Sequence, residues 1–84
     1  MNFSVDWTDD ALEALTALWL LSPDRSAITT AQAAIDLRLA INPQAAITPL
    51  REGLYAISVW PLRATLELIP EDRVVVVVGV SRLA

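Results

Sequence analysis

The sequence predicts one small α+β domain over residues 1–84, with a helical hairpin packed on a small, mainly antiparallel sheet of four strands. Three observations lead to this fold class. Apolar residues alternate with polar ones at the start of the chain, recur at helical spacing through its first half, and return in short strand-like runs after Gly53. The expected order is therefore β-α-α-β-β-β. A chain of 84 residues buries only a modest core.

The first strand is expected near the start, where Phe3, Val5 and Trp7 alternate with polar residues. Thr8 then provides an N-cap for a first helix. Two aspartates follow it, in the turn where the positive end of the helix dipole favours carboxylates. This helix is expected to run to Leu21. Its core-facing stripe is predicted to consist of Leu12, Leu15, Leu18 and Trp19.

A second helix is expected to begin near Pro23 or at Ser26. It should end before Pro43, because the residue that precedes a proline avoids helical geometry. Its buried stripe is predicted to consist of Ile28, Ala31, Ile35 and Leu39. A loop from Pro43 to about Glu52 then leads to the C-terminal half of the chain.

Three further strands are expected in that half, with turns at Trp60-Pro61 and at residues 70–72. Because two helices reverse the chain after the first strand, that strand should run antiparallel to the second or the fourth and parallel only to the third. Five consecutive valines in the last strand suggest a strand flanked on both sides, which favours the order 2-3-4-1. The alternative order 1-2-3-4 would leave this strand as an edge for a partner to cover. The predicted strands are Leu54–Val59, Arg63–Ile69 and Arg73–Val80.

Composition excludes several kinds of chemistry. The chain has no cysteine and no histidine, which excludes thiol chemistry, disulfides, Ser/His/Asp catalysis and thiolate or imidazole metal sites, and we predict no metal and no cofactor. Six arginines are outweighed by ten carboxylates, and the net charge of −4 disfavours direct binding of nucleic acid. No apolar run is long enough for a membrane span and no leader is apparent, which predicts a cytoplasmic protein.

The C-terminal half carries the motifs of a known family. These are Leu-Arg-Glu-Gly at 50–53, Tyr-Ala-Ile-Ser-Val at 55–59, Leu-Arg at 62–63, the valine strand, and Ser-Arg at 81–82. Together with the order of elements along the whole chain, they resemble the RelE/ParE toxin superfamily of type II toxin-antitoxin systems. The resemblance implies a bacterial toxin that a cognate antitoxin neutralises. It also implies one of two activities, because RelE-like toxins cut messenger RNA on the ribosome and ParE-like toxins inhibit DNA gyrase.

The resemblance also allows the two branches to be compared position by position. RelE-like enzymes carry two lysines on the strand that begins with the tyrosine, and the matching positions here are Ala56 and Ser58. The family's two arginines match Arg63 and Arg82, while no residue up to Ala84 matches its late tyrosine. Charge stabilisation and proton transfer would both be deficient. We therefore expect a ParE-like toxin that acts by binding, with a RelE-like endoribonuclease or a degenerate, non-toxic member as the alternatives.

Three arginines are candidates for contacts with a target or a partner. Arg51 lies beside Gly53, where it could contact a target or tie the loop to a carboxylate such as Glu52 or Asp36. Two further arginines are expected to converge at one end of the sheet and bind a partner, unless each is an isolated surface residue. They are Arg63 and Arg82.

Apolar residues complete the predicted binding surface. Trp60, on a turn before Pro61, is expected to be exposed and to touch a partner. Leu21 and Leu37 fall opposite the apolar stripes of their helices. In a chain that is 55% hydrophobic, two such leucines favour a surface for an antitoxin or for self-association into a homo-oligomer.

Overall fold

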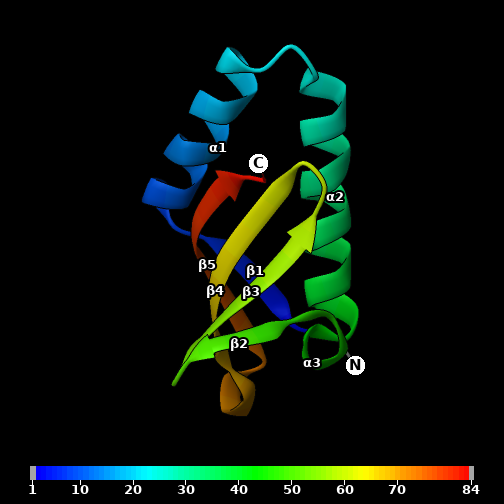
Figure 1. Ribbon diagram of the computed structural model, residues 1–84. Helices are drawn as coiled ribbons and strands as arrows, with labels where there is room; N and C mark the ends of the chain where they lie inside the picture. The colour runs from blue at the N-terminus through cyan, green and yellow to red at the C-terminus, as the bar shows by residue number, and fades with distance from the viewer. Residues whose placement is uncertain (1, 84) are drawn as a thin grey trace.

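The computed structural model describes residues 2–83 and has an α+β architecture, with a five-stranded mixed sheet and two long helices (Figure 1). The chain order agrees with the sequence prediction, apart from additional elements between the second helix and the Leu54 strand. The elements are β1 (Ser4–Trp7), α1 (Asp9–Leu21), α2 (Arg25–Ile41), α3 (Pro43–Ala46), β2 (Thr48–Arg51), β3 (Leu54–Val59), β4 (Leu62–Ile69), the 3-10 turn η1 (Pro70–Asp72) and β5 (Val74–Arg82).

Helix α2 has the predicted register. Its stripe faces the sheet, and each of the four side chains is at most 1% exposed. The helix ends at Ile41, immediately before Asn42 and Pro43, as the proline predicts. The confirmed stripe is Ile28, Ala31, Ile35 and Leu39.

The predicted stripe of α1 is only partly correct: Leu15 and Leu18 pack against the core as expected, but the other two residues of the stripe do not. Thr8 caps the helix as expected, since its hydroxyl accepts a 3.1 Å hydrogen bond from the amide of Ala11. However, Ala11 is fully buried, whereas Leu12 is 43% and Trp19 is 38% exposed. The helix packs mainly on β5, and Ala11, with its small side chain, lets it approach that strand. Leu12 and Trp19 consequently lie to the side of the contact with the sheet.

The segment predicted as a loop contains the short helix α3 and the strand β2. Strand β2 pairs antiparallel with β3, with Thr48 opposite Ala56 and Pro49 opposite Tyr55. All four residues of β2 are exposed, so the strand shows no alternation of buried and exposed side chains. Pro49 is tolerated because the strand forms the edge of the sheet.

The sheet has the order β1-β5-β4-β3-β2. The predicted strands 2, 3, 4 and 1 correspond to β3, β4, β5 and β1, so the favoured order 2-3-4-1 is confirmed and the valine strand β5 lies between two neighbours. The predicted orientation of β1 is wrong, because it pairs parallel with β5, with Val5 opposite Val75. The unpredicted strand β2 is the reason: it adds one more chain reversal before β3.

Both long helices cover the same face of the sheet, and α1 lies next to β5 while α2 lies next to β3 (Figure 1). The covered face holds the core, which is completed by strand residues that are at most 3% exposed, namely Ile57, Leu62, Ala64, Leu66, Val75 and Val77. The alternate residues of β3 and β4 face away from the helices, and three of them, Ser58, Arg63 and Glu67, are exposed. No helix within residues 2–83 is long and apolar enough to cross a membrane.

Candidate functional site

Arg82 sits at the end of β5 and reaches the loop between the two long helices. Its Nη1 and Nη2 donate hydrogen bonds of 3.0 and 2.9 Å to the two carboxylate oxygens of Asp24. Nη1 also lies 3.4 Å from the hydroxyl of Ser22. This two-pronged contact is the one ion pair that residues 2–83 form. The hydrogen bond from Arg82 lowers the pKa of Asp24 and raises that of Arg82.

Trp60 forms the other side of this group. Its ring centre lies 5.9 Å from the guanidinium carbon of Arg82, and 64% of the residue is exposed. We call Ser22, Asp24, Trp60 and Arg82 the Arg82 cluster. Leu21, which is 85% exposed, directly precedes Ser22. The fold therefore places three of the six predicted binding residues, Leu21, Trp60 and Arg82, in or directly beside the Arg82 cluster.

Arg63 does not join this cluster. It lies opposite Ser58 of β3 and Ser81 of β5, on the face that the helices leave open. Arg82 instead lies opposite Leu62, which is buried under the helices. Successive residues of a strand point to opposite faces. The two arginines thus share one end of the sheet but lie on opposite faces, and they do not converge as the sequence analysis expected.

The two positions that match lysines of the RelE-like enzymes differ in exposure. Ala56 is 4% exposed, between Thr48 of β2 and Thr65 of β4. Ser58 is exposed beside Arg63. The open face of the sheet therefore presents one cation near this position, with hydroxyl groups around it.

Arg51 and Leu37 lie away from the Arg82 cluster. Arg51 ends the edge strand β2 and is exposed, beside Gly53 with its φ of 77°. The expected contact between Arg51 and Asp36 is not formed. The Asp36 carboxylate instead accepts hydrogen bonds from the side chain of Trp7 at 2.7 Å and from that of Gln32 at 3.3 Å. Leu37 is 60% exposed, and its position on α2 lies about 18 Å along the helix from Arg25, at 1.5 Å per residue.

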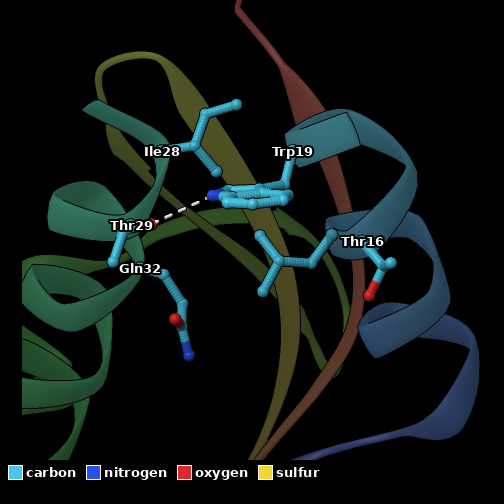
Figure 2. A pocket seen from close by; sticks show the side chains of 6 residues that line it. Thr16, Trp19, Ile28, Thr29 and Gln32 are labelled. Carbon is cyan, nitrogen blue, oxygen red and sulfur yellow. Dashed lines mark hydrogen bonds between the residues drawn. The ribbon is translucent and has the colours of Figure 1, made fainter. Parts of the chain in front are cut away.

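Helices α1 and α2 are separated by a pocket that the sequence analysis did not identify (Figure 2). Its volume is about 160 Å³. Trp19 forms one wall, and its indole nitrogen donates a 3.2 Å hydrogen bond to the hydroxyl of Thr29. We call this the interhelix pocket. Its lining residues are Leu15, Thr16, Trp19, Ile28, Thr29 and Gln32.

Arg25 fixes the closed end of the hairpin. Its guanidinium lies 4.6 Å from the centre of the Trp19 ring. It also donates hydrogen bonds of 3.0 and 3.1 Å to the carbonyls of Trp19 and Leu20, which are free at the end of α1. One signal in the sequence could have revealed this pocket. Helix α1 carries more large apolar residues than its contact with the sheet can bury, and Trp19, which is 38% exposed, lines the pocket instead. Within residues 2–83, no three or more acidic side chains are clustered so that they could hold a metal ion.

The order of helices and strands is that of the RelE/ParE fold, which solved structures of known proteins share with this chain. No protein family model and no curated protein matches the sequence. Among solved structures, the toxin-antitoxin complex RelBE2 of Mycobacterium tuberculosis contains a chain that is 22% identical, with a TM-score of 0.80, where the alignment covers 98% of this chain and 99% of that one.

Two further complexes show the same fold. A chain of the E. coli RelBE complex is 19% identical with a TM-score of 0.67, and the alignment covers 98% of each chain. A chain of the chromosomal ParDE system of Pseudomonas aeruginosa is 13% identical with a TM-score of 0.69, covering 98% of this chain and 97% of that one. Both names of the superfamily are thus represented among the structures that share this fold.

Proposed function

We propose that residues 1–84 act as one toxin domain of a type II toxin-antitoxin system in the bacterial cytoplasm. In this proposal the protein acts by binding a macromolecule, and a cognate antitoxin neutralises it. The shared fold with chains of RelBE and ParDE toxin-antitoxin complexes supports the assignment to this class. The arrangement of the cationic side chains supports binding over cleavage.

The separation of Arg63 from Arg82 carries the argument against a nuclease. A phosphate at one place cannot contact both side chains, because they lie on opposite faces of the sheet. The charge of Arg82 is also matched by Asp24, and Ala56 and Ser58 supply none. Loss of such electrostatic stabilisation typically costs a factor of about 100 to 1,000 in rate for each donor.

We therefore propose inhibition of the gyrase type, which the family resemblance favours once the nuclease groups are missing. Purified protein should inhibit supercoiling by gyrase and should leave ribosome-bound messenger RNA uncut. The variant with Arg63→Ala and Arg82→Ala should bind its target more weakly, with no cleavage to lose. Ribosome-dependent cleavage by the wild type that disappears in this double variant would restore the endoribonuclease alternative.

We propose the interhelix pocket as the contact for the antitoxin. Leu12 and Trp19 form an apolar stripe on α1 that the fold leaves partly exposed, and the pocket opens beside it. An apolar side chain on an amphipathic segment of the partner would fill the pocket, as occurs in helix-in-groove recognition. Burial of Trp19 would then supply a large part of the contact area.

Two substitutions on α1 test this contact. Thr16→Arg should close the pocket, because Thr16 lines it, whereas Ala17→Arg adds the same charge at an exposed position outside the lining. Both variants should fold, since arginine is a good helix former. With the product of the neighbouring open reading frame, Thr16→Arg should weaken co-purification by a factor of about 10 or more, and Ala17→Arg should not. If both substitutions weakened co-purification equally, the pocket would be excluded as the contact for the antitoxin.

Expression without the partner provides a second test. Leu21 is 85% exposed, and the protein also exposes Leu20 and Ile41, each to 57%. Exposed apolar surface of this kind favours association with a partner or with itself. The protein alone should self-associate or express poorly, and co-expression with the neighbouring gene product should correct this. A monodisperse monomer that does not bind that product would count against the proposal and favour a degenerate, non-toxic member.

A further inference from the structure

The hydroxyl and indole groups that line the interhelix pocket donate their hydrogens within the protein. The hydroxyl of Thr16 donates a 2.9 Å hydrogen bond to the carbonyl of Leu12. The hydroxyl of Thr29 donates one of 3.1 Å to the carbonyl of Arg25, and it accepts the 3.2 Å hydrogen bond from the indole nitrogen of Trp19. Each of these groups carries a single polar hydrogen, so none of them has a hydrogen left for an occupant of the pocket.

Asp36 fixes the orientation of the Gln32 amide. One oxygen of its carboxylate accepts a 3.3 Å hydrogen bond from the amide nitrogen of Gln32, and the other accepts one of 2.7 Å from Trp7. Because a carboxylate only accepts hydrogen bonds, the nitrogen of this amide must face Asp36. Figure 2 shows the amide oxygen on the side of the Trp19 ring and the nitrogen pointing away from it. The pocket therefore presents an acceptor and favours an occupant that carries a donor.

The charges beside the pocket disfavour a charged occupant. The guanidinium of Arg25 lies 4.6 Å from the centre of the Trp19 ring and places a positive charge at the closed end of the hairpin. Asp36 lies about 16 Å further along α2, at 1.5 Å per residue, and it is not part of the one ion pair that residues 2–83 form. A cation would be repelled at one end and an anion at the other. A neutral group with its donor toward Gln32 complements both charges.

The size of the pocket selects among neutral groups. Its volume is about 160 Å³, and a cavity of about 150 Å³ lined by apolar side chains holds one benzene molecule. We propose that the interhelix pocket binds the phenol ring of a tyrosine from the antitoxin, with the ring against Trp19 and the hydroxyl donating to the carbonyl oxygen of Gln32. Asp36 is then a positioning residue. This inference rests on the proposed function, which makes the pocket the antitoxin contact, and it names the side chain that fills it.

Two small probes test the selectivity of the pocket. They are p-cresol, which is the side chain of tyrosine, and toluene, which is the side chain of phenylalanine. Their affinities are measured by NMR titration, following the indole N–H signal of Trp19. The wild type should bind p-cresol about 3 to 10 times more tightly than toluene, because one hydrogen bond distinguishes the two probes.

Three variants identify the groups responsible for this preference. Gln32→Met keeps the length and helix propensity of the side chain but removes the acceptor, so the two probes should bind about equally. Gln44→Met makes the same change at an exposed residue outside the pocket lining and should leave the preference unchanged. Asp36→Asn can still accept from Trp7, but its amide nitrogen would turn the Gln32 oxygen away from the pocket. It should therefore also lose the preference, although it leaves the walls of the pocket intact.

A double-mutant cycle with the neighbouring gene product tests the tyrosine itself. Replacement of the bound tyrosine by phenylalanine should weaken the complex with the wild type by a factor of about 3 to 10 and should have no further effect on the complex with Gln32→Met. The inference is overturned if p-cresol and toluene bind the wild type equally, or if Gln32→Met retains the preference. It is also overturned if no change of tyrosine to phenylalanine in the partner weakens binding.

The Thr16→Arg variant separates this inference from the proposed function. If Thr16→Arg prevents co-purification while the wild type shows no preference for p-cresol, the pocket remains the antitoxin contact and the tyrosine assignment alone is wrong. If Thr16→Arg leaves co-purification unchanged, the pocket is not the contact, and the tyrosine assignment fails with it.

Discussion

Truncation of Ile35 to alanine should destabilise the protein severely. Ile35 is fully buried between α2 and the sheet, and its replacement by alanine removes three carbon atoms from the core. At about 0.8 kcal/mol per methylene, the transfer contribution alone is about 2.4 kcal/mol. The residual cavity raises the expected loss to about 2–5 kcal/mol. For 84 residues the total stability is roughly 4–13 kcal/mol, so this one change could unfold a large fraction of the molecules.

Urea unfolding followed by tryptophan fluorescence measures this loss. With a slope near 1 kcal/mol per molar urea, the midpoint should fall by about 2 M or more. Leu37→Ala, on the same helix but at a residue that is 60% exposed, is the matched control and should change stability by about 0.5 kcal/mol or less. A loss below about 1 kcal/mol for Ile35→Ala, or equal losses for both variants, would refute the packing of α2 described above.

Three smaller perturbations test particular contacts. Because Arg82 lowers the pKa of Asp24, their contact should stabilise the fold above the ordinary Asp value of 3.8, and this contribution should disappear as the pH falls through the lower folded-state pKa. The free energy of unfolding, measured against pH for the wild type and Asp24→Asn, tests this contribution. Identical pH dependence of the two proteins would refute it. Trp7→Phe removes the 2.7 Å hydrogen bond to Asp36 and should cost about 1–3 kcal/mol in urea unfolding. Gly53→Ala should cost about 1–2 kcal/mol from strain alone, because φ is 77° and the added methyl group meets no atom within 4 Å; an unchanged melting temperature would contradict this.

The sequence was most informative where a segment has only one apolar face. Helix α2 is such a segment: between Ile28 and Leu39 its apolar residues recur at helical spacing, and the structure buries the predicted stripe. Five valines in succession correctly indicated a strand with neighbours on both sides. The sequence motifs also indicated the RelE/ParE fold, which the structural comparison confirms.

The predictions failed where a segment carries more apolar residues than one face needs, or fewer. Helix α1 has enough leucines for two faces, so periodicity could not decide that Ala11 and not Leu12 would lie against β5. Strand β2 has no buried residue, so nothing in its pattern separated it from a loop. The omission of β2 then reversed the expected direction of every later strand relative to β1.

The sequence by itself determined the class of fold, the buried face of α2 and the absence of thiol and imidazole chemistry, because these follow from local periodicity and from residue type. Tertiary structure alone decided which side chains meet. Strand register placed Arg63 and Arg82 on opposite faces of the sheet. The path of the helical hairpin brought Asp24 to Arg82 from 58 residues away. Such contacts depend on how elements dock in space, and local sequence patterns carry no information about that docking.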